Sequence, residues 1–251
     1  MIDSHAHLLF FENKEELINS MANDDLSSIV TIGTTLDDSR KSLELACGND
    51  NIYAAVGIYP EYAQDVCEND LMQIEELAKN DKVVAIGEIG LDYHTVGFDK
   101  EKQKEIFVKQ LEIANRQRLP FCIHCRNAAK DVYEILEENK HLIKNSGVMH
   151  CYSEGAEWID KFLSLGLYIS FSGNITYKKS DRSFIKKIPL NRILVETDAP
   201  FLSPEPLRGR VNQPKNVKFI IEKIADELEM DAKELAEITE KNAKKLYFKI
   251  K

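Results

Sequence analysis

The segment Val83-Val84-Ala85-Ile86-Gly87-Glu88 places a short apolar run directly before a carboxylate. Short apolar runs rich in β-branched residues predict buried strands. An amphipathic helical pattern follows over Lys100 to Arg118. A strand followed by a helix is the repeating unit of folds with a parallel sheet, so the number of such units decides the architecture.

The same unit recurs along the whole chain. The predicted strands are Ile2 to His5, Ser28 to Ile32, Tyr53 to Gly57, Val83 to Glu88, Phe121 to His124, Gly147 to His150, Leu167 to Phe171 and Ile193 to Glu196. The predicted helices are Glu12 to Met21, Ser39 to Cys47, Asp70 to Lys79, Lys100 to Arg118, Ala128 to Asn139, Gly155 to Leu165, Arg182 to Lys187 and Lys215 to Leu228. Eight units predict an α/β fold, a (β/α)8 TIM barrel. We expect a last helix, Asp231 to Leu246, to pack outside the ring.

The length of 251 residues suits one barrel domain spanning residues 1–251. An open doubly wound sheet is the alternative, and it is disfavoured because no glycine-rich phosphate loop follows the first strand. The segment Pro200 to Pro214 holds four prolines and predicts a fixed loop after the last strand.

The composition, 43% hydrophobic and 30% charged, is typical of a globular protein. The net charge of −9 argues against a protein that coats nucleic acid non-specifically. Between Lys178 and Lys218, however, ten Lys or Arg stand against four Asp or Glu, which suits local binding of an anionic substrate. Five cysteines do not predict a disulfide framework. Without an apolar run of about 20 residues or a signal-peptide pattern, we expect a cytoplasmic protein with no membrane partner.

Potential metal ligands stand at the carboxyl ends of the predicted strands. They are His5, His7, Glu88, His124, His150 and Asp198. In a TIM barrel these ends converge on one mouth, where catalytic residues lie. Side chains alternate along a strand, so the spacing of His5 and His7 puts both imidazoles on one side, with Ala6 facing away.

Two observations favour a metal site here: the direction in which alternate side chains point along a strand, and the number of potential ligands that fall at strand ends. If Val84 and Ile86 point into the barrel, Glu88 does too. Taken singly, a histidine is more often a packed or surface side chain, a buried glutamate an ion-pair partner and an aspartate a turn cap. Yet four of the six histidines fall at the predicted mouth, whereas His94 and His141 do not end strands.

Imidazole and carboxylate ligands without thiolate suit Zn, Mn, Mg or a similar divalent ion. One catalytic zinc typically takes three protein ligands, so six ligands predict two divalent ions. The two ions would be held by His5, His7 and Asp198 and by His124 and His150, with Glu88 as the bridge. Such a pair can clamp a phosphodiester and lower the pKa of water. Asp198 is the predicted group that orients this water and accepts its proton.

Two further carboxylates share strand parity with these ligands. They are Asp3, which precedes His5, and Glu196, which precedes Asp198. Buried carboxylates need partners, so we expect each to accept an N–H from a ligand histidine.

Basic and aromatic residues near the strand ends are the candidates for substrate binding. Arg126 lies two positions past His124, and Arg208 lies in the proline-rich loop; both are predicted to bind phosphate. Three tyrosines that follow strand ends could stack on a base or pack in the rim, and Tyr93 is the one we predict as a substrate contact; the others are Tyr59 and Tyr152.

The cysteines beside these histidines do not predict a further site. Cys122 and Cys125 face opposite sides of one strand and cannot bind one ion together. With Cys151, they are expected to be small packing residues.

Six motifs occur in order over nearly the whole chain. They are Ile2-Asp3-Ser4-His5-Ala6-His7, Gly57-Ile58-Tyr59-Pro60, Gly87-Glu88-Ile89-Gly90-Leu91-Asp92-Tyr93, Ile123-His124-Cys125-Arg126, His150-Cys151-Tyr152-Ser153 and Glu196-Thr197-Asp198-Ala199-Pro200. Together they resemble the TatD family of metal-dependent deoxyribonucleases. The resemblance implies an amidohydrolase-type TIM barrel, a divalent-metal site and DNase activity, often exonucleolytic, with family ligands at the same six positions. One departure is Asn212-Gln213-Pro214, where the family often has Asn-Glu-Pro.

The predicted function is therefore hydrolysis of DNA phosphodiesters, of the 3′–5′ exonuclease type, on single strands or 3′ ends. A D-aminoacyl-tRNA deacylase is the alternative on the same site. Amidases and lactonases of this fold often bridge their metals with a modified lysine, and Glu88 stands there instead. A non-catalytic barrel that binds nucleic acid is disfavoured because all six ligands are present.

Overall fold

The computed structural model describes residues 1–251, in which eight parallel strands pair in chain order. The strands are β1 (Ile2–Ala6), β2 (Ser28–Ile32), β3 (Ile52–Val56), β4 (Val83–Asp92), β5 (Phe121–Arg126), β6 (Gly147–Met149), β7 (Tyr168–Phe171) and β8 (Ile193–Val195). Just beyond β8, a parallel bridge between Ala6 and Ala199 brings the last strand to the first, so the barrel is nearly closed. The predicted TIM barrel is confirmed.

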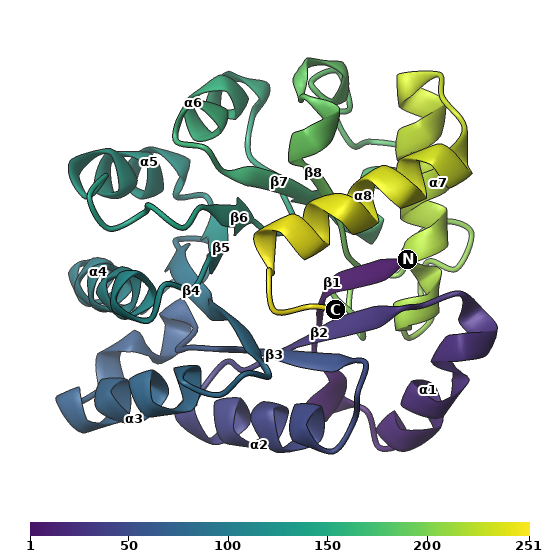
Figure 1. The fold of residues 1–251 in the computed structure, drawn as a ribbon. Helices are drawn as coiled ribbons and strands as arrows, with labels where there is room; N and C mark the ends of the chain where they lie inside the picture. Colours follow the sequence, from purple (N-terminus) through teal and green to yellow (C-terminus); the bar gives the residue numbers. More distant parts are fainter.

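Helices pack around the barrel and across one end of it (Figure 1). They are α1 (Lys14–Ser20), α2 (Leu36–Cys47), α3 (Glu68–Ala78), α4 (Lys100–Gln117), α5 (Ala129–Glu138), α6 (Ile159–Ser164), α7 (Val217–Leu228) and α8 (Ala232–Leu246). Side chains cap several amino ends: Asp99 accepts the N–H groups of Glu101 and Lys102 at the start of α4. None of these helices has the length and apolar character needed to cross a lipid bilayer.

The seventh unit departs from the prediction. The helix expected over Arg182 to Lys187 is only a 3-10 turn, Ile185–Lys187. Pro189 follows closely, and a proline disfavours helical backbone at the residue before it and cannot donate an N–H to the helix. The chain between β7 and β8 is therefore built of short turns, which include Gly173–Thr176 at the mouth.

The last helix lies elsewhere than expected. Its end joins an apolar cluster inside the barrel, made of Ile2, Val30, Ile32, Tyr53, Ala55, Val84, Ala85, Cys122, Val148, Tyr168, Leu194, Ala243, Leu246, Tyr247 and Ile250. In Figure 1, α8 crosses the barrel end near both chain termini. It therefore covers the amino-terminal end of the strands instead of packing on the outer ring, and the carboxyl-terminal end is left for the site.

Strand β4 does not alternate regularly. Val84 belongs to the cluster inside the barrel, whereas Ile86 belongs to the large cluster between strands and helices. The parity predicted for Ile86 is therefore wrong, because the pairing of β4 with β3 shifts register between Val83 and Ala85. A second shift, against β5, falls between Ile86 and Ile89. Bulges of this kind re-aim side chains, and Glu88 reaches the mouth through them.

Candidate metal centre

Six side chains from five strand ends meet at the barrel mouth: His5, His7, Glu88, His124, His150 and Asp198. The Nε2 atoms of His5 and His7 lie 3.4 Å apart, and Ala6 between them faces away and packs in the outer cluster, as predicted. The imidazole of His150 stacks on His5 with ring centroids 4.1 Å apart. Nitrogens from distant segments therefore face a common space.

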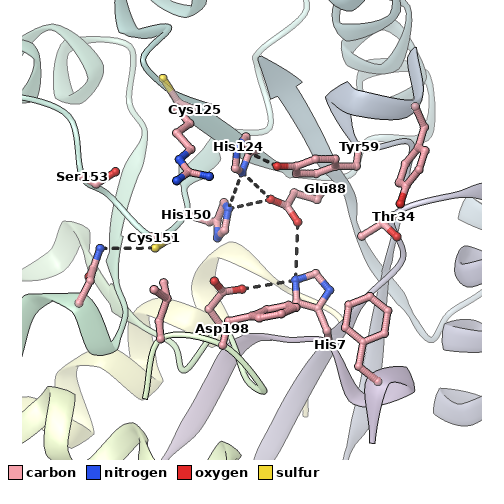
Figure 2. A pocket seen from close by; sticks show the side chains of 16 residues that line it. His7, Thr34, Tyr59, Glu88, His124, Cys125, His150, Cys151, Ser153 and Asp198 are labelled. Atoms are coloured by element: carbon pink, nitrogen blue, oxygen red, sulfur yellow. Dashed lines mark hydrogen bonds and ion pairs between the residues drawn. The ribbon is translucent and has the colours of Figure 1, made fainter. Parts of the chain in front are cut away.

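Glu88 lies at the middle of this group. Its Oε1 is 2.8 Å from both His124 Nδ1 and His150 Nε2. Its Oε2 is 3.6 Å from His5 Nε2 and 3.8 Å from His7 Nε2. Figure 2 shows Glu88 between His7 on one side and His124 and His150 on the other. Each carboxylate oxygen therefore faces a different pair of histidines.

Asp198 closes the group from the end of β8. Its Oδ1 lies 3.3 Å from His7 Nε2 and 3.6 Å from His5 Nε2. The residue has a left-handed φ of 55°, which Asp tolerates better than most residues, and its N–H donates to the carbonyl of His5. Its side chain is 13% exposed, against 3% for Glu88. Asp198 is thus the carboxylate that an incoming molecule reaches first.

The donor set fits divalent cations. Three overlapping groups of side chains have ligand atoms within 4.8 Å of one another: His5, His7 and Glu88; Glu88, His124 and His150; and His5, His150 and Asp198. Nitrogen lone pairs that face each other at this spacing need a proton or a cation between them. All donors are imidazole or carboxylate, which suits Zn, Mn or Mg. Glu88, His5 and His150 each belong to two of the three groups, and Glu88 is the carboxylate among them.

At the metal centre, the neighbouring charged side chains shift the pKa values of Glu88 and His150 more than burial does. Burial raises the pKa of Glu88, but the imidazoles of His150 and His124 hold that pKa well below its usual range. Burial lowers the pKa of His150, but Glu88 and Glu196 raise it well above its usual value. Burial and the neighbouring His150 lower the pKa of His5. Protons and cations therefore compete for the same nitrogens.

Glu196 lies where a ligand histidine needs an acceptor. His150 Nδ1 is 3.1 Å from Glu196 Oε1, which also accepts the N–H of Cys151 at 2.6 Å. Ser170 Oγ donates to the other carboxylate oxygen at 2.6 Å. Because Nδ1 is engaged there, Nε2 of His150 is turned toward Glu88.

Asp3 does not reach a histidine ring, which corrects the expectation for this residue. Its carboxylate accepts the backbone N–H of Thr197 at 2.9 Å, the Thr197 hydroxyl at 2.5 Å and the backbone N–H of His5 at 3.3 Å. The pairing of β1 shifts register between Asp3 and Ala6, so Asp3 and His5 do not share one face. Burial raises the pKa of Asp3 to about 8. Its contacts hold the segment that leads to Asp198.

Asp92 is a site residue that strand prediction missed. Strand β4 continues past Glu88, and Asp92 Oδ2 lies 2.9 Å from His124 Nε2. The Tyr59 hydroxyl donates to the same carboxylate at 3.1 Å. Burial opposes ionisation, but the hydrogen bond from His124 lowers the pKa of Asp92 to about 2. Asp92 thus keeps a proton on Nε2 of His124 and leaves Nδ1 free to face Glu88. The sequence does contain a signal for Asp92, because residues at even spacing on one strand share a face and Asp92 follows Glu88 at such a spacing.

A glycine makes this contact possible. Gly90 has φ +134°, and a Cβ at this position would lie 2.1 Å from the carbonyl oxygen of His124. Any side chain would push β4 away from β5, and the distance between Asp92 and His124 would grow.

Five of the six ligands, all except the fully buried His5, line a cavity of about 530 Å³, but the predicted substrate residues do not all reach it. Arg126 lines it, as does Tyr59. Arg208 instead lies over the Tyr177 ring at 4.3 Å, in a neighbouring groove with Lys178 and Lys179. The Tyr93 hydroxyl donates to Asp131 at 2.8 Å, on α5. Because Asp92 points into the mouth, its neighbour Tyr93 points away, and the expectation that it contacts substrate is corrected.

The other residues singled out in the sequence lie around the centre. The Tyr152 hydroxyl donates to the carbonyl of Gly155 at 2.8 Å, so this side chain packs locally. Cys122 lies inside the barrel with Sγ 3.4 Å from His5 Nδ1, and Cys125 packs in the outer cluster. His94 and His141 are exposed.

The fold and the site define a class of protein. A TIM barrel with histidine and carboxylate ligands at the carboxyl ends of its strands is the architecture of metal-dependent hydrolases of the amidohydrolase type. A family profile described as "TatD related DNase" matches residues 2–248. The chain belongs to this TatD family of metal-dependent hydrolases.

Relatives agree with this assignment. The chain is 41% identical to an uncharacterized metal-dependent hydrolase, YabD of Bacillus subtilis (strain 168), with 98% of each chain covered. It is 34% identical to YcfH of Escherichia coli (strain K12), another uncharacterized metal-dependent hydrolase, over 98% of this chain and 95% of the relative. The crystal structure of YjjV, a TatD homolog from Escherichia coli K12, superposes with a TM-score of 0.93 at 28% identity, covering 99% and 98% of the two chains. A solved structure described as molecular engineering of organophosphate hydrolysis activity from a weak promiscuous lactonase template shares the fold alone, with a TM-score of 0.67 and 12% identity over 98% and 95% of the chains.

Proposed function

We propose that this protein is a deoxyribonuclease that hydrolyses DNA phosphodiesters at its metal centre, as an exonuclease of the 3′–5′ type. The observation that carries the proposal is the position of Glu88, which turns one oxygen to His124 and His150 and the other to His5 and His7. This arrangement is suited to hold two divalent ions. When bound, such ions supply Lewis-acid polarisation of the phosphate and a lowered pKa of water.

The protein's own groups provide the proton transfer. Burial raises the pKa of Asp198, but the hydrogen bond from His7 and the charges of the histidines lower it below its usual value. Asp198 is therefore ionised at neutral pH and lies at the accessible side of the centre. It orients the attacking water and accepts its proton. Glu196 and Asp92 hold the rings of His150 and His124 in place.

The charge around the mouth supports an anionic substrate. The chain carries a net charge of −9, yet Arg126 lines the cavity beside the ligands. A guanidinium binds phosphate oxygens through charge-assisted hydrogen bonds. The cavity volume of about 530 Å³ is within the range that binds small ligands, so it suits the end of a flexible strand.

The test is nuclease activity of metal-stripped protein that is re-supplied with Mg, Mn, Zn or Co one at a time. Single-stranded DNA labelled at either end, double-stranded DNA, RNA and a D-aminoacyl-tRNA are offered in parallel. We expect EDTA-sensitive shortening of single-stranded DNA from its 3′ end. Glu88→Gln should be inactive, and His141→Ala, which changes an exposed histidine, serves as the control. Deacylation without DNA cleavage by the metal-loaded protein would refute the proposal.

A further inference from the structure

Two exposed phenylalanines stand at the rim of the metal cavity. Phe10 is 51% exposed and Phe201 is 50% exposed, and both line the cavity that holds the ligands. Their ring centroids are 5.9 Å apart with an interplanar angle of 79°. They come from distant parts of the chain, one from the 3-10 turn Leu8–Phe10 after β1 and the other from the turn after β8.

The aromatic pair is continuous with the metal centre. Phe10 stacks on the ring of His7 with centroids 5.4 Å apart and an interplanar angle of 12°. Phe201 meets the same imidazole edge-on at 5.8 Å. Both phenylalanine rings therefore pack against His7, whose Nε2 faces Asp198 and Glu88.

The backbone that carries both rings is held in place. The N–H of Phe10 donates to the carbonyl of His7 at 3.1 Å. The N–H of Phe201 donates to the carbonyl of Asp198 at 2.9 Å, and the carbonyl of Phe201 accepts the buried Asn212 amide at 2.8 Å. Two exposed rings on a backbone held in this way, beside a cavity that also contains the predicted metal ligands, indicate a ligand with an apolar face.

We propose that Phe10 and Phe201 form a stacking subsite for one nucleobase of the DNA strand, that of the nucleotide whose phosphate lies at the metal centre. The proposal rests on the proposed nuclease function and names what the rim recognises. A nucleotide has an anionic half and a flat aromatic half. In this cavity, Arg126 and the metal centre can bind the anionic phosphate, and the two phenylalanine rings can stack on the aromatic base.

Stacking on aromatic side chains fits an enzyme that degrades any sequence. Every base has a π face, so stacking is sequence-tolerant, and it contributes enough per base to change affinity by roughly tenfold or more. The subsite therefore selects for the presence of a base and not for its identity. It also predicts that a strand with a missing base at the reacting nucleotide binds poorly.

The experiment compares Phe10→Ala and Phe201→Ala with the wild type, all loaded with the same divalent ion. Phe248→Ala is the matched control, because Phe248 is 58% exposed and follows α8, at the other end of the barrel. The substrates are a single-stranded oligonucleotide, two versions with an abasic residue at the 3′ or the 5′ terminus, and a D-aminoacyl-tRNA. Metal content and thermal melting of each variant are measured alongside.

We expect the wild type to show a KM about tenfold or more higher for the strand with the 3′ abasic residue than for the intact strand. Each alanine variant should raise the KM for the intact strand by a similar factor, with unchanged metal content, and should lose the distinction between intact and abasic strands. Phe201→Trp, which keeps an aromatic face, should retain the distinction, and Phe248→Ala should behave as wild type.

Two results would overturn the subsite while leaving the nuclease function intact: equal KM values of the wild type for intact and abasic strands, or alanine variants that still discriminate. If the variants impair only deacylation of a D-aminoacyl-tRNA, the rings bind an amino-acid side chain and the subsite for a base is refuted. A wild-type protein that cleaves none of the DNA strands would overturn the proposed function itself, and this subsite with it.

Discussion

Asp92→Asn is expected to weaken metal binding at His124 without unfolding the protein. Asn has the same shape as Asp, so Oδ1 can still accept the N–H groups of His94 at 2.9 Å and Thr95 at 3.3 Å. The other terminal atom becomes an NH2 group, which cannot accept from His124 Nε2. The ring then prefers its proton on Nδ1, the atom that faces Glu88 at 2.8 Å.

The size of the effect follows from this one contact. The bond between Asp92 and His124 is 2.9 Å long and charge-assisted, and such bonds contribute about 1.5–3 kcal/mol. Loss of a carboxylate behind a ligand histidine lowers metal affinity roughly 10- to 100-fold, which is the same range of free energy. An ion held by His5 and His7 would not use His124, so its affinity should change little.

The assay is a metal titration by calorimetry or against a fluorescent chelator, with Zn and Mn tested separately. Asp131→Asn is the control, since it removes a carboxylate that binds Tyr93 outside the cavity. At saturating metal, Asp92→Asn should recover much of the wild-type kcat. If both metal-binding constants of Asp92→Asn equal those of the wild type, Asp92 does not set the tautomer of His124.

Other perturbations test the remaining parts of the centre. Glu88→Ala should abolish hydrolysis and lower the metal content at both positions, measured by elemental analysis; retention of both ions would contradict bridging. Asp198→Asn should keep the fold but lower kcat by about 10²- to 10⁴-fold, and a near-normal kcat would reject its role as base. Arg126→Ala should raise the KM for DNA about tenfold and reduce its salt dependence; an unchanged KM would exclude a phosphate contact. Burial lowers the pKa of His150, but Glu88 and Glu196 raise it well above its usual value, so protons must leave when an ion binds. Metal affinity should therefore increase with pH, and calorimetry in buffers of different ionisation enthalpy should detect released protons; pH-independent affinity would contradict this.

Much of the barrel could be predicted because strands and helices follow local patterns. Runs such as Val83 to Glu88 indicate a strand by composition, and barrel geometry then gathers the strand ends. The helix predicted over Arg182 to Lys187 was wrong because Pro189 limits that segment to a short turn. The inward direction of Ile86 was also wrong, since the shift in register depends on the neighbouring strand.

The sequence by itself determined the eight strands and most of the helices between them, and it placed histidines and carboxylates near the strand ends, because these features depend on residues close along the chain. Only the tertiary structure decided which oxygen of Glu88 faces which imidazole, that Asp92 joins the site while Tyr93 leaves it, and that Phe10 meets Phe201. These contacts join segments far apart in sequence. Their geometry is set by strand register, bulges and closure of the barrel, and no local pattern encodes those.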